Sequence, residues 1–179
     1  RPDAVIEIGC QFASSSLWIA DRLASIRRYG GPTDPLVVAL DIDTAAATVA
    51  LDTADPAWRE RIALIEADIT DPSLPARVEE ALGGRRNCMV IEDSAHTYQT
   101  TIAALKGFAR FVAPGGYLIV EDGVVDVEEL RLLPDWPRGV HRAISEFLSG
   151  DSGVEFVRRA DLEPYGLTSH PGGYLQRRA

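Results

Sequence analysis

Residues 4–24 read AVIEIGCQFASSSLWIADRLA, and this stretch contains the pattern that predicts the fold. The apolar run 4–9 ends in glycine, which is typical of a short buried strand followed by a tight turn. A serine cluster comes next, after which Leu17, Ala20 and Leu23 recur at helical spacing. The stretch therefore predicts a strand, a loop and a helix, in that order.

The same pattern repeats along the chain. Further short apolar runs predict strands at 36–42, 62–67, 88–92 and 117–121, and two late strands at 154–158 and 173–177. Helical patterns occur at 44–53, 73–82, 97–112 and 139–148. Strands that alternate with helices form a parallel sheet with helices on both faces. We predict an α/β fold with a Rossmann-like, doubly wound sheet, mostly parallel with a late antiparallel strand, as one domain over residues 1–179.

The composition is that of an ordinary soluble globular protein, with 179 residues of which 46% are hydrophobic and 25% charged. No apolar run approaches the ~20 residues that a membrane span needs. A formal net charge of −9 repels phosphate backbones and anionic lipid surfaces, so neither nucleic acid nor a membrane is an expected partner. Cys10 and Cys88 lie in apolar runs, as buried thiols do in a reducing cytosol, and we expect a cytoplasmic protein. Because the sequence begins with Arg1 and not Met, we expect that a further N-terminal segment precedes it.

Acidic residues follow nearly every predicted strand. The carboxyl ends of parallel strands meet at one edge of the sheet, where ligands bind in folds of this kind. Carboxylates gathered there repel one another and raise each other's pKa, so a cation or several hydroxyl groups should neutralise them. The residues at these strand ends are Glu7, Gly9, Asp41, Asp43, Asp68, Asp93, Ser94, His96, Glu121 and Asp122.

The first loop departs from the dinucleotide-binding pattern G-x-G-x-x-G, because bulkier residues occupy its second and third glycine positions. A Walker lysine pattern is also missing, which argues against ATP or GTP hydrolysis. What remains is a tight turn at Gly9 and a helix N-terminus at Ser14, Ser15 and Ser16, whose free N–H groups suit a carboxylate. The alternative is that Gly9 is only a turn and that the serines cap the helix.

Asp41 and Asp68 are the candidate contacts to a nucleoside. Asp41 closes the second strand, where an acid accepts hydrogen bonds from a ribose diol. Asp68 closes the third strand and could receive an adenine amino group, or it could serve as a turn or cap residue instead. Asp43 is expected to cap the following helix.

The strongest group of site residues is Asp93 with Glu121 and Asp122. These residues end the fourth and fifth strands, which a doubly wound sheet makes neighbours, and three carboxylates form a hard-oxygen site for Mg²⁺ or a similar ion. His96 follows Asp93 by three residues and could act as a general base toward a hydroxyl bound there. The alternative for His96 is a helix-start residue bonded to the backbone. No role is predicted for the two other histidines, His141 and His170.

Five blocks of the sequence resemble one enzyme family. They are VIEIGCQFASSSLW at 5–18, ALDID at 39–43, EDSAHTY at 92–98, PGGYLIVED at 114–122 and HPGGYLQRR at 170–178. In this order they resemble the cephalosporin hydroxylase/rhamnosyl O-methyltransferase family and, around the metal site, macrocin-type sugar O-methyltransferases. The D-S-x-H and G-G-Y-L-x-V-E-D blocks are the more specific ones, and the resemblance covers almost the whole chain.

The resemblance implies a class I methyltransferase fold that uses S-adenosylmethionine and Mg²⁺. Residues 12–14 depart from the family, whose members often have glycines there. The residues that match the family's functional positions are the metal ligands Asp93, Glu121 and Asp122, the base His96, the cofactor turn at Glu7 and Gly9, and the ribose acid Asp41.

We therefore expect a metal-dependent O-methyltransferase that transfers a methyl group from S-adenosylmethionine to a hydroxyl of a sugar or a glycosylated natural product. Asp93 and His96 are its expected catalytic residues. The family also implies a homo-oligomer. Two alternatives remain: a hydroxylation component or assembly partner that binds cofactor and metal, and a non-catalytic α/β module that binds no cofactor.

Overall fold

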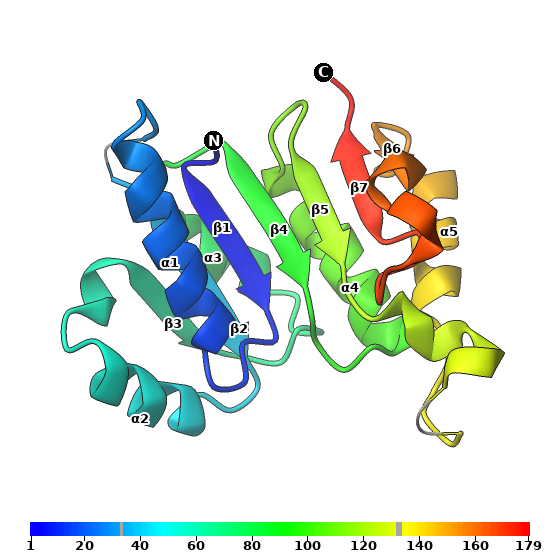
Figure 1. Ribbon diagram of the computed structural model, residues 1–179, viewed down its shortest axis with the longest axis horizontal. Helices are drawn as coiled ribbons and strands as arrows, with labels where there is room; N and C mark the ends of the chain where they lie inside the picture. Colours follow the sequence, from blue (N-terminus) through cyan, green and yellow to red (C-terminus); the bar gives the residue numbers. More distant parts are fainter. Residues whose placement is uncertain (33, 132–133) are drawn as a thin grey trace.

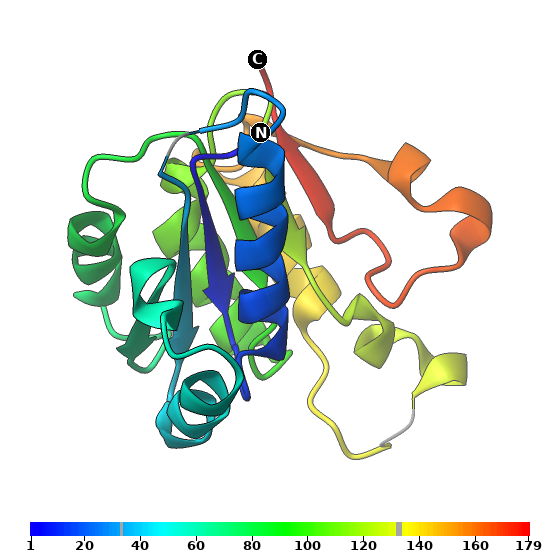
Figure 2. The ribbon, with the colours of Figure 1, turned by 60° about the vertical axis from the view of Figure 1, so that its left-hand side comes forward.

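The computed structural model describes residues 1–32, 34–131 and 134–179. In this part of the chain, a seven-stranded sheet in the order β3-β2-β1-β4-β5-β7-β6 carries helices on both faces (Figures 1 and 2). The strands are β1 Ala4–Ile8, β2 Leu36–Asp41, β3 Ile62–Glu66, β4 Cys88–Glu92, β5 Tyr117–Val120, β6 Phe156–Arg158 and β7 Tyr174–Arg177. The α-helices are α1 Ser14–Arg27, α2 Ala45–Ala54, α3 Leu74–Leu82, α4 Tyr98–Phe108 and α5 Val140–Ser149.

The predicted fold class is confirmed. Strands β1 to β5 are parallel, and β7 runs antiparallel to both of its neighbours, β5 and β6. The helix predicted at 97–112 is shorter: α4 ends at Phe108, a 3-10 turn covers Ala109–Phe111, and Val112 already pairs with Cys88 at the start of β4. The strand predicted at 154–158 begins only at Phe156, since the preceding residues lie in a turn in which the Phe156 N–H bonds to the Gly153 carbonyl.

Successive residues of each strand point to opposite faces of the sheet, and each face has its own core. On one face, Ile6 and Val38 belong to a buried cluster with α3, α4 and α5. On the other face, Val5 and Val37 pack with α1 and α2. Figure 1 shows α1 in front of the sheet and α4 behind it. Because β1 and β2 are covered on both sides, their sequences are apolar runs and do not alternate with polar residues.

None of the helices in the described part of the chain is long and apolar enough to cross a membrane.

The order of the strands reverses at β1, which pairs with β2 on one side and β4 on the other. Such a switch point opens a crevice at the carboxyl ends of the strands. The two backbones meet closely there: a Cβ placed on Gly9, whose φ is +89°, would lie 2.1 Å from the carbonyl oxygen of Asp93. Glycine is therefore required at the end of β1 both by the backbone angle and by the neighbouring chain.

Two alanine substitutions test this close approach. Gly84 has a φ of +90°, almost the same as Gly9, but nothing lies within 4 Å of its Cβ position. Gly84→Ala should cost only the backbone strain, about 1–2 kcal/mol of the free energy of unfolding. Gly9→Ala adds the overlap with Asp93 and should cost at least about 4 kcal/mol, as measured by urea unfolding. Equal losses in the two variants would contradict the close approach.

Candidate active site

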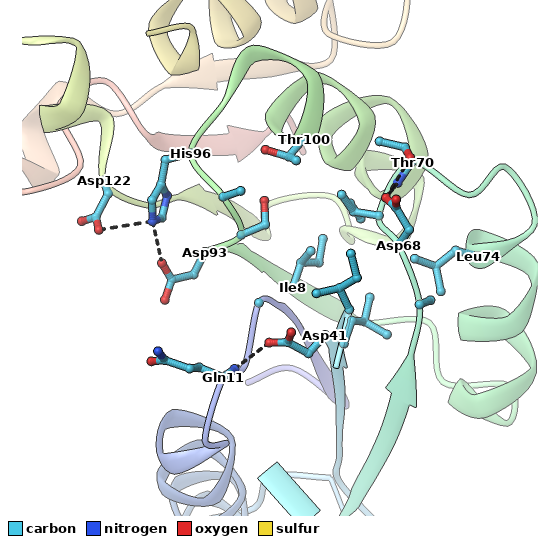
Figure 3. A pocket seen from close by; sticks show the side chains of 17 residues that line it. Ile8, Gln11, Asp41, Asp68, Thr70, Leu74, Asp93, His96, Thr100 and Asp122 are labelled. Carbon is cyan, nitrogen blue, oxygen red and sulfur yellow. Dashed lines mark hydrogen bonds and ion pairs between the residues drawn. The ribbon is translucent and has the colours of Figure 1, made fainter. Parts of the chain in front are cut away.

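A cavity of about 700 Å³ opens at the carboxyl ends of the strands around the switch point. Figure 3 shows Asp68 and Thr70 toward one end of it, Asp41 in the middle, and Asp93, His96 and Asp122 toward the other. The cavity is lined by Ile8, Gly9, Gln11, Leu40, Asp41, Ile42, Ala67, Asp68, Ile69, Thr70, Leu74, Asp93, Ser94, Ala95, His96, Thr100 and Asp122.

The cavity brings together most of the residues that the sequence predicts for the site. Those in its lining are Gly9, Asp41, Asp68, Asp93, His96 and Asp122. The predicted nucleoside contacts and the predicted metal and catalytic residues thus share one space. Other predicted residues lie away from the lining, namely Glu7, Ser14, Ser15 and Glu121.

Glu7 links β1 to α1 through a hydrogen bond and does not face the cavity. It is 2% exposed and accepts a hydrogen bond from Ser16 Oγ. Burial raises the pKa of Glu7, while hydrogen bonds from Ser15 and Ser16 oppose that rise. Ser14 and Ser15 are exposed, and the N-cap position of α1 is Ala13, which has no hydroxyl to cap the helix. The cofactor roles of Glu7, Ser14 and Ser15 stay predictions.

The loop between β1 and α1 contains two strained residues. Gln11 and Ala13 have φ angles of 47° and 55°, in the left-handed region that favours glycine. Gln11 stands at the second glycine position of the dinucleotide pattern, so the chain adopts there a backbone angle that glycine would supply more easily. The Gln11 N–H donates to Asp41 Oδ2 at 2.7 Å, which ties this loop to the end of β2.

The three acids after β2 and β3 have different roles. Asp41 faces the cavity and accepts hydrogen bonds from the N–H groups of Gln11 and, at 3.3 Å, Asp43. Asp43 accepts from the Ala45 N–H at 2.9 Å, but the N-cap position of α2 is Thr44, so Asp43 stands one residue before the cap and the prediction that it caps the helix is wrong. Asp68 accepts from the N–H and the hydroxyl of Thr70, at 2.8 and 2.7 Å, and these bonds lower the pKa of Asp68. Asp68 is therefore a turn residue that also lines the cavity.

Asp93, His96 and Asp122 converge at the other end of the cavity. His96 Nε2 lies 3.8 Å from Asp93 Oδ1 and 3.6 Å from Asp122 Oδ2. One ligand atom from each of the three residues lies within 4.8 Å of the others. His96 and Asp122 have φ angles of 51° and 50°, and left-handed backbone in residues other than glycine is concentrated at functional sites.

At this end of the cavity the carboxylates repel one another, and burial disfavours the charged forms of Asp93 and His96. Burial raises the pKa of Asp93 to about 7, and the charges of Glu121 and Asp122 add to the rise. Burial lowers the pKa of His96, because the interior disfavours the imidazolium, and the attraction of Asp122 offsets this only in part. The group therefore lacks the positive charge that its carboxylates would need to ionise easily.

The donor set fits a divalent cation. Asp93 and Asp122 offer the hard oxygen ligands that Mg²⁺ prefers, and a cation would remove the repulsion that raises the pKa of Asp93. His96 Nε2 faces these carboxylates, while His96 Nδ1 is buried without a hydrogen-bond partner among the described residues. One ring nitrogen is thus available for a ligand or a proton.

Glu121 faces a histidine to which the sequence analysis gave no role. Its Oε2 lies 3.8 Å from His170 Nε2, and its N–H donates to the Glu92 carbonyl at 2.8 Å. Burial raises the pKa of Glu121. Among the neighbouring charges, Glu121 contributes most to the raised pKa of Asp93, so it lies near the metal candidates without joining their cluster. Its role as a third ligand stays a prediction. His170 stands far from Glu121 in sequence, and the pairing of β5 with β7 brings the two together.

Glu92 is a second residue that the sequence analysis did not identify. It is fully buried, and its carboxylate accepts hydrogen bonds from the N–H of Ser94 at 3.3 Å, from the Ser94 hydroxyl, and from Thr101 Oγ1 at 3.4 Å. Thr97 begins α4 with a capping box. These bonds fix both ends of the loop 93–96, and this loop presents Asp93 and His96 to the cavity. The only sequence signal was an acid at a buried position of a strand.

The strand order and the cavity at the switch point belong to a Rossmann-like fold, which the chain shares with solved methyltransferases. A putative O-methyltransferase from Klebsiella pneumoniae has a TM-score of 0.63 at 19% identity, over 99% of this chain and 74% of that chain. The MycE methyltransferase from the mycinamycin biosynthetic pathway, solved with Mg, SAH and mycinamycin VI, has a TM-score of 0.54 at 14% identity, over 99% of this chain and 44% of that chain.

The chain belongs to the Rhamnosyl O-methyltransferase/CmcI family, whose family model matches residues 1–178. The rhamnosyl O-methyltransferase of Mycobacterium tuberculosis is 25% identical over 181 residues, which span 99% of this chain and 68% of the relative. The predicted family and enzyme class are confirmed: the protein is an S-adenosylmethionine-dependent O-methyltransferase.

Replacing Asp93 by asparagine should stabilise the protein when no metal is present. The pKa of Asp93 is about 7 in the folded protein, which is above its value in the unfolded chain. Ionisation of Asp93 therefore costs more in the folded state, and the protein loses stability as pH rises from the unfolded pKa to the folded one. The neutral amide would remove this loss, so the Tm of Asp93→Asn in a chelator should exceed that of the wild type at pH 8. Because the Asp93 side chain is 38% exposed, solvent screening limits the gain to about 1 kcal/mol, or roughly 3 °C.

The difference between Asp93→Asn and the wild type should shrink toward pH 5, where Asp93 is protonated in the folded protein. Asp43→Asn is the control, because Asp43 lies outside the cavity lining and the amide oxygen of asparagine can still accept the hydrogen bond from the Ala45 N–H. A wild-type Tm that equals or exceeds that of Asp93→Asn at pH 8 would show that the carboxylates do not repel one another as described.

Proposed function

We propose that the protein is a metal-dependent O-methyltransferase that moves the methyl group of S-adenosylmethionine to a hydroxyl of a sugar or glycoside. The observation that carries the proposal is the shared cavity: Asp41, at the end of β2, and the group formed by Asp93, His96 and Asp122 line one space. A nucleoside held at one end would direct its reactive end toward the acids and the histidine at the other.

In this proposal the cofactor's ribose binds at Asp41 and its adenine lies toward Asp68. Asp41 presents a carboxylate to the cavity at the position where such sheets bind a ribose diol. Ile42, Ile69 and Leu74 line the same region and would provide apolar contacts to an adenine ring. The Asp68 carboxylate, anchored by Thr70, would accept a hydrogen bond from the adenine amino group.

The metal would be held by Asp93 and Asp122, with Glu121 as the proposed third ligand. A divalent ion bound there would supply a positive charge that lowers the pKa of a neighbouring acceptor hydroxyl. The protein's own part is to hold the acceptor oxygen in line with the methyl group, since sulfonium is already a good leaving group.

His96 would take the proton of the acceptor hydroxyl. Its pKa is lowered by burial, so the imidazole is neutral near pH 7 and can accept a proton. The acceptor oxygen then forms its bond to the methyl carbon while the carbon–sulfur bond breaks, and the cofactor leaves as a neutral thioether. Asp93 and Asp122, both within 4 Å of the His96 ring, would stabilise the protonated histidine.

The comparisons support the class of acceptor. Curated relatives act as rhamnosyl O-methyltransferases, and MycE was solved with magnesium, SAH and a natural product. From the same resemblance we propose that residues 1–179 form one domain and that the protein acts as a cytoplasmic homo-oligomer.

Asp41→Asn should weaken the binding of S-adenosylmethionine. Replacing the carboxylate by an amide removes a charged acceptor, so we expect affinity to fall by about tenfold or more in calorimetric titration. Asp43→Asn is the matched control, because Asp43 stands two residues away, lies outside the cavity lining and bonds to the Ala45 N–H instead, so the affinity of this variant should equal that of the wild type. Equal affinity in both variants would place the ribose elsewhere.

His96→Asn should abolish most methyl transfer while leaving the cofactor bound. Asparagine tolerates the left-handed backbone at this position but cannot take up the proton, so kcat should fall by at least about 100-fold. The measurement is methyl transfer from radiolabelled S-adenosylmethionine to vicinal-diol sugars, with cofactor binding measured alongside. Turnover within a few-fold of the wild type would contradict the base assignment. Full activity after chelator treatment would contradict the proposed metal dependence but not the role of His96.

A further inference from the structure

The segment 169–173 is fastened to the end of β5 by bonds that surround the acidic pair Glu121 and Asp122. The Val124 N–H donates to the Ser169 carbonyl at 3.0 Å, and the Val120 N–H donates to the Gly173 carbonyl at 2.9 Å. His141 Nε2 lies 2.9 Å from the Pro171 carbonyl. We call residues 169–173 the β7 latch. It reaches the backbone on both sides of the pair, although it lies about fifty residues later in the chain.

The latch requires glycine at position 173, and Gly123 on the other side of the contact leaves little room for a side chain. A Cβ on Gly173 would lie 2.0 Å from the Val120 carbonyl oxygen, and a Cβ on Gly123 would lie 3.0 Å from the Pro171 carbonyl oxygen. The two backbones therefore approach more closely than side chains would permit. Such an approach fixes the position of the latch relative to the end of β5, and with it the position of the His170 ring.

The His170 ring contacts both residues of the acidic pair. His170 Nδ1 accepts a hydrogen bond from the Asp122 N–H at 2.9 Å. With Nδ1 as the acceptor, the neutral ring has its proton on Nε2, which lies 3.8 Å from Glu121 Oε2. The side chain is 19% exposed and packs edge-on against Tyr174.

The hydrogen bond from the Asp122 N–H to His170 holds the backbone of Asp122 in place. Asp122 has a φ of 50°, and such strained residues persist only where their surroundings hold them. His170 provides the acceptor for this N–H, and the short helical turn Gly123–Asp126 begins directly after Asp122. Loss of the acceptor would let Asp122 relax to an ordinary backbone angle and carry its carboxylate away from Asp93 and His96.

We propose that His170 is a positioning residue for the metal site: through the hydrogen bond to Nδ1 it holds Asp122, while its Nε2 faces Glu121 Oε2 at 3.8 Å. This inference rests on the proposed metal dependence of the enzyme. Histidine and carboxylate groups that orient metal ligands typically change metal affinity by about 10–100-fold when they are removed. The role differs from that of His96, which faces the cavity directly.

The test is the affinity of the protein for Mn²⁺ and Mg²⁺ without cofactor or acceptor, measured by calorimetry and by electron paramagnetic resonance of Mn²⁺. His170→Ala removes both contacts and should weaken metal binding by about tenfold or more. His170→Asn places an amide oxygen near the former Nδ1 and should restore most of that loss. The affinity for S-adenosylmethionine should stay within about threefold of the wild type, since Asp41 and Asp68 lie at the far end of the cavity.

His141→Gln is the matched control, because His141 also bonds to the latch but, among the described residues, forms no hydrogen bond or ion pair with Glu121 or Asp122. Its metal affinity should stay near that of the wild type. In turnover assays, His170→Ala should raise the Mg²⁺ concentration for half-maximal rate while kcat at saturating Mg²⁺ stays close to normal.

Three outcomes would overturn the proposal. They are unchanged metal affinity in folded His170→Ala, equal losses in His170→Ala and His170→Asn, and an equal loss in His141→Gln. If His170→Ala fails to fold, His170→Asn and His170→Gln decide, and metal binding lost in both would overturn the role assigned to Nδ1. A wild-type protein that binds no divalent ion would instead contradict the proposed metal dependence. The two failures are therefore distinguishable.

Discussion

Repulsion between carboxylates at one edge of the sheet is the constraint to which much of this structure responds. The parallel pairing of β1, β4 and β5 brings acids from several strand ends to the same place, where burial keeps water from screening them. Hydroxyl groups relieve part of the cost: Ser16 bonds to Glu7, and Ser94 and Thr101 bond to Glu92. Asp93 forms no hydrogen bond to a hydroxyl in the described part of the chain, and burial raises its pKa to about 7.

Backbone strain is concentrated at the same edge. In the described part of the chain, the non-glycine residues with positive φ are Gln11, Ala13, His96, Asp122 and Tyr165, and all but Tyr165 lie in the loops after β1, β4 and β5. Two of these four donate their N–H to a side chain from another element, Gln11 to Asp41 and Asp122 to His170. The strain is thus held in place by contacts between distant segments, which is how a site acquires a fixed shape before any ligand binds.

The sequence predicted much of the site because strand ends can be located from apolar runs alone. Asp41, Asp93 and Asp122 each follow such a run, and parallel strands must bring their ends together. The prediction was less informative for Glu7, which also stands in a strand but points toward α1, where Ser16 covers it. A strand pattern gives the position of a residue along the sheet, but which helix covers its side chain depends on the direction in which each connection leaves the sheet.

The sequence by itself determined the alternation of strands and helices, the parallel sheet, and the gathering of acids at its carboxyl edge, because these follow from local hydrophobic periodicity and from the geometry of parallel strands. It also determined the family. Only the tertiary structure decided that Glu121 faces His170, that Glu92 is sealed beneath the loop of His96, and that Gln11 is bonded to Asp41. The contacts of Glu121 and Gln11 join segments far apart in the chain, and the loop that covers Glu92 contains the left-handed backbone of His96. Local patterns of residues encode neither kind of feature.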